Sequence, residues 1–295
     1  MERREVEYFL AVAENGSFTA AARALRIAQP SLSAAIGQLE NRLGGKLFHR
    51  LPHGVRLTQA GEALLEPARQ VVRDLSTARD SVRQVLGLTA GRLDIVAQTT
   101  LAVDPLAGLL GEFLHHHPKV DVRVLDPELG AAVTSSVRAG ECELGMVDTT
   151  SDPDDLEGLR LPGREVYAVL PPGGHDRKRI GLSELAALDF VATPPGTATR
   201  AVIEDVVAAR DARPRVAVET AHQAMIVPLV LAGAGATLLP ESMAAGAARE
   251  GATVLPLRPK VVRGGRLFWR PGPLAPAAAR FVELASGLAR RSRTE

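Results

Sequence analysis

The sequence contains few of the residues and patterns on which several classes of protein depend. Cys142 is the single cysteine among 295 residues, so the chain can form neither an internal disulfide nor a zinc site built from cysteines. No apolar run approaches the roughly 18 residues that a membrane-spanning helix needs. The N-terminal segment also lacks the apolar stretch and the cleavage site of a signal peptide. These absences predict a cytoplasmic protein with no membrane partner.

Patterns for catalysis and for metal binding are absent as well. The three histidines 115–117 would point in different directions at the end of a helix, so they cannot converge on one metal ion. The glycine-rich segment 231–238 follows a predicted helix and precedes a predicted strand, which reverses the order in a dinucleotide site. Neither a nucleophile elbow nor a zincin signature occurs. We therefore predict no catalytic residues, no metal site, no cofactor and no enzymatic activity.

Acidic residues are scarce in one short part of the chain. The net charge of the whole chain is only +1, whereas residues 16–58 hold six arginines and lysines against the single acidic residue Glu40. A basic segment on a near-neutral chain indicates a polyanionic partner such as nucleic acid. A solvated basic surface would have the same composition, so charge alone leaves both interpretations open.

The spacing of apolar residues in this basic part predicts two helices joined by a short connection. The first covers residues 18–26, and the second begins at residue 29 and buries Leu32, Ile36 and Leu39, which lie three and four residues apart. The other side of the second helix carries only small, nearly uncharged residues. This arrangement is typical of a helix-turn-helix, whose second helix enters the major groove of DNA. A helical hairpin with a purely structural role is the alternative.

Residues 47–57 have the pattern of a β-hairpin, because two short strands flank the turn residues 52–54. A hairpin that follows a helix-turn-helix is a wing. It would place Arg50, His53 and Arg56 against phosphates or in the minor groove. The alternative is a surface hairpin whose basic residues only keep the protein soluble.

A heptad pattern follows the wing. Apolar residues recur at alternating intervals of four and three along a predicted helix at 58–88, as in a helix that pairs with a second helix. We therefore predict that two copies of the chain dimerise through Leu64, Ala68, Val71, Leu75, Ala78, Val82 and Val85.

From residue 91 onward, strand patterns alternate with helix patterns. This alternation predicts a largely parallel sheet with helices on both faces, and such sheets bind ligands beyond the carboxyl ends of their strands. Hydroxyl groups at strand ends suit a carboxylate or a similar small anion, although threonine also serves as an ordinary helix cap. The candidate ligand contacts are Thr99, Thr100, Glu128, Thr149, Thr193, Thr197, His222 and Gln223.

The whole chain resembles a known family, most specifically near its N-terminus and more weakly after residue 90. Residues 9–65 are similar to the DNA-binding region of the LysR-type transcriptional regulators at over twenty positions, which include Gln29-Pro30, Leu39-Glu40 and the run at 57–61. The family often has basic residues where this chain has Ala34 and Gly37. Because an arginine that could pair with guanine is missing from the helix, we predict that DNA binding relies on the wing and on DNA shape.

The resemblance implies an α/β multi-domain protein. It places a winged helix-turn-helix at 1–58, a coiled-coil linker helix at 59–88 and an effector domain like the type 2 periplasmic binding proteins at 91–295. Lobe I of that domain would hold 91–161 and 266–295, and lobe II would hold 162–265.

The resemblance also implies a function: a sequence-specific transcriptional regulator, controlled by a small anionic effector between the lobes. Its partners would be promoter DNA, RNA polymerase and further copies of itself in a homodimer or homotetramer. The alternative from another class is a solute-binding or enzymatic α/β domain fused to a DNA-binding domain. The predicted DNA contacts are Arg23, Gln29, Pro30, Ser31, Ser33, Ala34, Gln38, Arg50, His53 and Arg56.

Overall fold

The structure, a computed structural model, describes residues 1–51, 54–85, 91–127, 129–148, 153, 155–173, 178–209 and 212–291. The chain divides into two compact units. We call residues 1–88 the head, to which residues 139–141 attach, and residues 89–138 with 142–295 the sensor. No helix of the described part is long and apolar enough to cross a membrane.

Three helices form most of the head: α1 (Arg3–Asn15), α2 (Phe18–Leu25) and α3 (Gln29–Leu43). The α1 helix ends where Gly16 adopts a left-handed conformation, and Ser17 then caps α2 by accepting a hydrogen bond from the Ala20 amide. The inner face of α3 is buried against α1 and α2, with Leu32 and Leu39 fully buried. These elements confirm the predicted helix-turn-helix.

The predicted wing is also present, as strands β1 (Phe48–Leu51) and β2 (Gly54–Leu57) in antiparallel register. The Phe48 ring packs against Phe9 of α1 at a centroid distance of 5.4 Å, which fixes the hairpin to the helices. Gly54 is required where the hairpin approaches α1, because a Cβ there would lie 2.6 Å from the Gly16 carbonyl oxygen.

The long helix α4 (Gln59–Val85) follows the wing. Its first half belongs to the head, because Ala68 is fully buried in the head core and Leu64 packs against that core. Ala68 is therefore not available to a second helix, and the predicted dimer seam is corrected at this position. Further along α4, Leu75 and Val82 are 41% and 59% exposed, and Ala78 is exposed as well. Val71 is half-buried, and the side chain of Val85 lies outside the described part.

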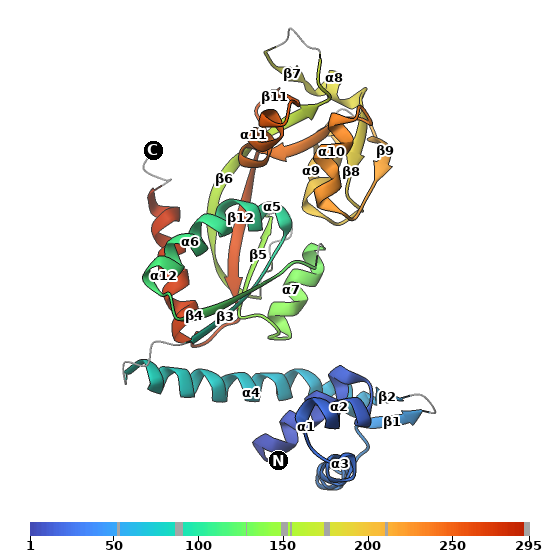
Figure 1. Cartoon of the computed structure of the whole chain (residues 1–295), viewed down its shortest axis with the longest axis vertical. Coiled ribbons are helices and arrows are strands. Elements are labelled where there is room, and N and C mark those ends of the chain that lie inside the picture. The colour runs from blue at the N-terminus through green and yellow to red at the C-terminus, as the bar shows by residue number, and fades with distance from the viewer. Residues whose placement is uncertain are drawn as a thin grey trace. The chain divides into compact units, whose positions relative to one another are not determined.

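A mixed sheet organises the sensor, in the strand order β4-β3-β5-β12-β6-β11-β7 with β10 paired to β6 (Figure 1). The strands β3 and β4 run parallel, as do β3 and β5, whereas β12 is antiparallel to both β5 and β6. The expectation of a largely parallel sheet is therefore wrong, because β10, β11 and β12 all pair antiparallel with β6, although β11 is parallel to β7 on its other side. The strands are β3 (Gly91–Ala97), β4 (Val120–Leu125), β5 (Leu144–Asp148), β6 (Glu157–Leu170), β7 (Ile180–Gly181), β10 (Thr237–Pro240), β11 (Thr253–Arg258) and β12 (Val262–Trp269).

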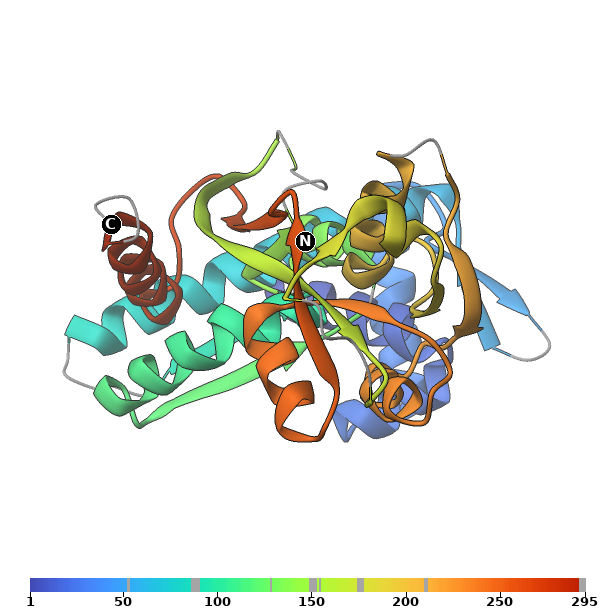
Figure 2. The same ribbon diagram turned by 90° about the horizontal axis from the view of Figure 1, so that it is seen from above.

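Helices and a further strand pair cover this sheet. The two-stranded parallel sheet of β8 (Asp189–Ala192) and β9 (Arg215–Glu219) lies on the opposite side of the sensor from α6 and α12 in both views (Figures 1 and 2). The sequence analysis did not predict strands β7 and β11, the first half of β6, or the helices at Leu182–Ala186 (α8) and Glu241–Arg249 (α11). The helical segments are α5 (Thr99–Leu101), η1 (Ala102–Leu106), α6 (Ala107–His116), α7 (Gly130–Arg138), α8 (Leu182–Ala186), α9 (Ala198–Ala208), η3 (Gln223–Met225), α10 (Ile226–Leu231), α11 (Glu241–Arg249) and α12 (Pro276–Arg291).

The sensor contains two large apolar cores. The first includes Ile95 and Phe281, and the second includes Phe190 and Ile203. Strand β6 contributes to both, because Leu161 lies in the first core and Val166, Ala168 and Leu170 lie in the second. The division of this unit into two lobes stays a prediction.

Candidate functional site

The outer face of α3 is exposed and slim. Gln29, Pro30, Ser31, Ala34 and Gln38 are exposed there, on the side opposite the buried leucines, and Ser33 is half-buried. A Cβ added at Gly37 would meet nothing within 4 Å, so the middle of this face is open. Such a face can enter the major groove without steric conflict. Arg23 is exposed on the neighbouring helix α2.

Arg50 of the wing is fixed beside α3. Its Nη2 donates a hydrogen bond to the Ser33 hydroxyl at 2.9 Å. Its guanidinium carbon also lies 4.9 Å from the centroid of the Phe18 ring, a cation–π distance. The structure thus places a positive charge next to the first three turns of α3, whose exposed residues Gln29, Ser31 and Gln38 are uncharged. Arg56 is exposed on β2, and His53 lies outside the described residues.

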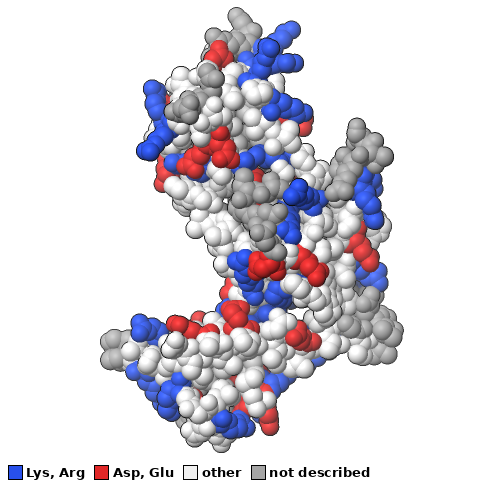
Figure 3. Space-filling model, turned by 180° about the vertical axis from the view of Figure 1, so that it is seen from behind, with Lys and Arg blue, Asp and Glu red and all other residues white. Residues whose placement is uncertain are grey.

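Basic side chains gather over the wing end of the head (Figure 3). The wing itself is fixed through Glu40, at the end of α3. This buried carboxylate accepts hydrogen bonds from Lys46 Nζ at 2.7 Å and from the Leu47 amide at 2.9 Å. Burial alone would raise the pKa of Glu40, but the hydrogen bonds from Lys46 and Leu47 outweigh it and hold the pKa below its ordinary value.

In the sensor, five of the eight candidate ligand contacts line one cavity, which we call the threonine cavity. It is a narrow recess that is partly open to solvent. Its walls come from the end of β3, from the start of α9 and from the segment after β9, three places that lie far apart in the sequence. None of its lining side chains is charged. The lining residues are Gln98, Thr99, Thr100, Thr193, Thr197, Ala198, Ala221 and Gln223.

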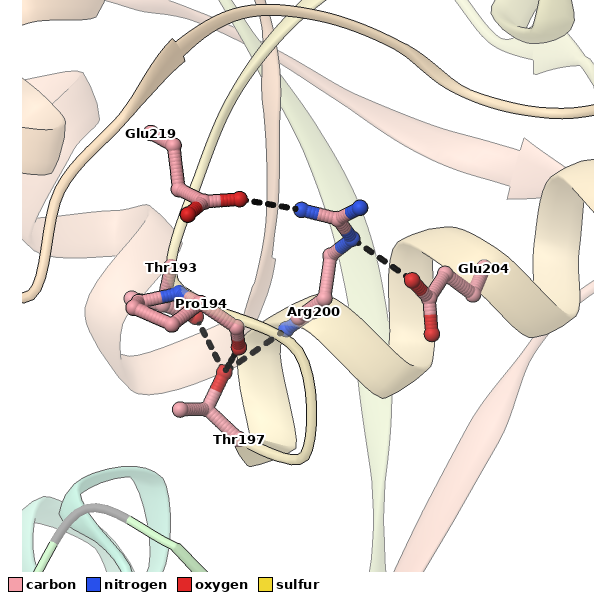
Figure 4. A network of polar contacts seen from close by, with 6 residues as sticks. All are labelled: Thr193, Pro194, Thr197, Arg200, Glu204 and Glu219. Carbon is pink, nitrogen blue, oxygen red and sulfur yellow. Dashed lines mark hydrogen bonds and ion pairs between the residues drawn. The ribbon is translucent and has the colours of Figure 1, made fainter.

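Two of these threonines are held by local hydrogen bonds (Figure 4). The Thr197 hydroxyl hydrogen-bonds with the Thr193 hydroxyl, donates to the Pro194 carbonyl oxygen at 2.8 Å and caps α9 through the Arg200 amide at 3.4 Å. Thr197 therefore has the structural capping role that is the alternative to ligand binding. The Arg200 guanidinium is engaged by Glu204 and Glu219.

Two glutamines complete the polar lining. Gln98 is 3% exposed, and its Oε1 accepts a hydrogen bond from the Asp148 amide at 2.8 Å. Gln223 Nε2 donates to the Thr199 hydroxyl at 3.4 Å. Gln223 Oε1 is buried and has no hydrogen-bond partner among the described residues. A buried acceptor without a donor is costly, so this atom is suited to a ligand hydroxyl or amino group.

The structure tests only one of the other three candidate contacts. His222 is exposed, and it is not part of the lining. Glu128 and Thr149 lie outside the described residues. Thr99 lines the cavity, but its hydroxyl already donates to the Asp126 carboxylate.

A second cavity, which sequence reasoning missed, adjoins the first. We call it the arginine cavity; it is a narrow recess that shares Thr100 and Ala198 with the threonine cavity. Burial holds the pKa of Arg164 below its ordinary value, although the charges of Asp104 and Asp148 raise it. Arg164 directly precedes one predicted strand and Arg263 begins another. Arginines at these places beside apolar strand residues are the signal that could have identified this site. The lining residues are Thr100, Asp148, Arg164, Val166, Ala198, Thr199, Val202, Leu238, Pro240 and Arg263.

The described residues offer no group of three or more His, Cys, Asp or Glu side chains that could hold a metal ion. The side chains that line the two cavities can form hydrogen bonds and, in the arginine cavity, pair charges.

Comparison with known proteins assigns both units to one family. Residues 3–62 match the family model "Bacterial regulatory helix-turn-helix protein, lysR family", and residues 61–289 match "LysR substrate binding domain". The transcriptional regulator ShiR of Corynebacterium glutamicum is 31% identical over 81% of this chain and 82% of its own length. The regulator IlvR of Caulobacter vibrioides is 29% identical over 96% of this chain and 97% of its own length.

Solved structures agree with this assignment. The full-length regulator CbnR, in a crystal structure with its target DNA, is 26% identical and has a TM-score of 0.72, covering 99% of this chain and 100% of CbnR. The relatives are transcriptional regulators and not enzymes.

Proposed function

The chain belongs to the LysR family of transcriptional regulators, and on that premise we propose how its DNA-binding head and its ligand-binding sensor act. The head binds double-stranded promoter DNA with α3 in the major groove. The exposed polar face of α3 is the observation that carries this proposal, because it lies directly opposite the buried face and is bordered by the basic wing. The CbnR structure with its target DNA supports the class of partner.

Within the head, we assign two kinds of DNA contact. The side chains of Gln29, Ser31 and Gln38 reach base edges or nearby phosphates. Arg23, Arg50 and Arg56 neutralise phosphates or enter the minor groove, which gives affinity that depends strongly on salt.

The threonine cavity of the sensor is the proposed effector site. Its hydroxyls and amides surround a space suited to a small polar molecule. We propose a small anion, such as a carboxylate, as the effector. A ligand in this cavity would contact Thr99 and Thr100 of one proposed lobe as well as Thr193 and Gln223 of the other.

Self-association follows from α4. The exposed apolar residues Leu75, Ala78 and Val82 keep the heptad spacing beyond the part that the head core covers. We propose that two chains pair through this segment to form a dimer, which further sensor contacts extend to a tetramer. Effector binding then changes the spacing of the heads on DNA and their contact with RNA polymerase in the cytoplasm.

A mobility-shift titration on the intergenic region upstream of the protein's own gene tests the proposal. We expect a specific complex whose affinity falls steeply between 50 and 200 mM salt, by about 10³-fold if six phosphates are contacted. The double variant Arg50→Ala, Arg56→Ala should lose this complex, and Arg215→Gln, at an exposed ion pair of the sensor, should retain it. A salt-insensitive or non-specific complex in the wild type would contradict the proposal.

A further inference from the structure

The arginine cavity is built around two opposed cations. Arg164 on β6 and Arg263 on β12 are direct partners in the antiparallel register, so their side chains share one face of the sheet. Like charges directly opposite each other are destabilising in a strand pair. Both arginines nevertheless line the same cavity.

The protein satisfies these guanidinium groups only in part. Arg164 Nη1 donates to the backbone carbonyl oxygens of Thr100, at 2.9 Å, and of Asp104. Arg263 Nη1 donates to the Asp205 carboxylate at 2.7 Å, and its Nε lies 3.4 Å from Asp148 Oδ2. Among the described residues, Arg164 Nε and both Nε and Nη2 of Arg263 are buried with no hydrogen-bond partner.

The acidic groups near the pair do not supply the missing acceptors. Asp148 is the only acidic residue in the described cavity lining. Asp205 is 58% exposed and lies outside the lining. Asp104 contacts Arg164 through its backbone, and its charge favours the protonated guanidinium without overcoming the cost of burial. Buried N–H groups of a cation without acceptors are costly, so the cavity is complementary to an anionic group.

The two adjoining cavities thus differ in what they lack. Among the described residues, the arginine cavity has three buried guanidinium nitrogen atoms with no hydrogen-bond partner, although Arg263 Nε still pairs at 3.4 Å with Asp148, whereas the threonine cavity has one oxygen atom, Gln223 Oε1, without a donor. We propose that the effector is a small hydroxy- or amino-carboxylate whose acidic group binds Arg164 and Arg263 and whose hydroxyl or amino group binds Gln223. The inference rests on the proposed effector site and gives the bound molecule an orientation. Val166, Val202 and Leu238 provide an apolar wall for its carbon skeleton.

Calorimetry and thermal shift on the full-length chain can test this orientation with matched probes. The probes are 3- and 4-hydroxybenzoate and 4-hydroxybutyrate, compared with benzoate and butyrate, which lack the hydroxyl group, and with phenol and 1,4-butanediol, which lack the acid. We expect at least one hydroxy acid to bind at least about 10-fold more tightly than either of its matched compounds. A change of about tenfold in affinity is the typical contribution of one hydrogen bond to a charged group.

Variants then separate the two ends of the ligand. Arg263→Gln and Arg164→Gln should each remove the preference for the acid over the alcohol, and Arg263→Lys should restore part of it. Gln223→Leu should remove the preference for the hydroxy acid over the plain acid. Arg215→Gln, at the exposed ion pair with Asp189, is the matched control and should bind like the wild type. Unliganded melting temperature and DNA affinity check that each variant folds.

The outcomes distinguish this inference from the proposed function. If Thr193→Ala weakens probe binding while both arginine variants bind the probe as the wild type does, the inference is overturned. The proposed effector site would remain. A calorimetric stoichiometry of two plain carboxylates per chain, reduced to one by Arg263→Gln, would support the anion subsite with a separate molecule as its occupant. No binding of any probe would overturn the inference and also count against an anionic effector.

Discussion

The head and the sensor place their polar side chains in opposite ways. In the head, α3 buries Leu32, Ile36 and Leu39 and exposes Gln29, Ser31 and Gln38, so the recognition surface faces outward. In the sensor, Thr100, Thr193 and Asp148 are less than 10% exposed and surround internal cavities. The difference corresponds to the size of the ligand. A groove of DNA must be met by a protruding surface, whereas a small molecule gains most of its affinity from being enclosed.

The largest expected effect comes from the buried face of α3. Ile36→Ala removes a side chain that is 1% exposed and should destabilise the head by about 2–4 kcal/mol. The matched variant Gln38→Ala, on the exposed face of the same helix, should change stability by less than about 0.5 kcal/mol. Hydrogen exchange of head peptides measures both changes. Equal loss of protection in the two variants would mean that α3 has no distinct inner and outer faces.

On the surface that faces DNA, we expect the wing to contribute more to DNA affinity than the exposed face of α3. Arg56→Ala should weaken binding about 10-fold and reduce the salt dependence by about one phosphate contact. Gln38→Ala should weaken binding less, because a neutral side chain contributes little to phosphate binding. Titrations of both variants at two salt concentrations provide the comparison. A larger loss for Gln38→Ala would show that α3 reads bases more strongly than its composition predicts.

A smaller effect, confined to the sensor, is expected at the threonine cavity. Thr193→Ala removes a buried hydroxyl and should weaken a bound carboxylate about 3- to 10-fold, the value of one hydrogen bond. DNA affinity without ligand should stay the same. Thr99→Ala should act in the same direction. Calorimetry with the best-binding probe measures this change, and unaltered ligand affinity in both variants would remove the threonines from the effector site.

The smallest effect is a pH dependence specific to the head. Because folding lowers the pKa of Glu40, its carboxylate stabilises the head above its ordinary pKa of 4.5, and this contribution is lost as the pH falls through the lowered value. Glu40→Gln should cost about 1 kcal/mol at pH 7, and the difference from the wild type should shrink in acid. Glu62→Gln, at an exposed residue of α4, is the control. A pH-independent difference in hydrogen exchange of the wing would contradict this role.

The two units also differ in how far the sequence predicts them. The head depends on local signals: helix caps such as Ser17, apolar residues three and four apart, and turn residues between short strands. These signals predicted its helices and wing. The heptad pattern of α4 was less informative, because spacing shows that Ala68 is buried but not whether a second copy or the head core buries it.

In the sensor, strand ends predicted the threonine cavity, because the carboxyl ends of neighbouring strands meet in space. The arginine cavity was not predictable in this way. Arg164 and Arg263 are 99 positions apart in the printed sequence, and only the antiparallel register of β6 and β12 brings them together. The alternation of strand and helix patterns led us to expect a largely parallel sheet. The antiparallel return of β12 along β6 makes the sheet mixed.

The central claim is that a ligand enclosed in the sensor changes how the head engages DNA. Nuclease footprints on the upstream intergenic region, with and without a saturating hydroxy-carboxylate probe, test it most directly in the wild type and in Thr193→Ala. The account predicts that the ligand alters the length of the protected region or its hypersensitive sites in the wild type, and that Thr193→Ala needs more ligand for the same change. Identical wild-type footprints with and without bound ligand would contradict it.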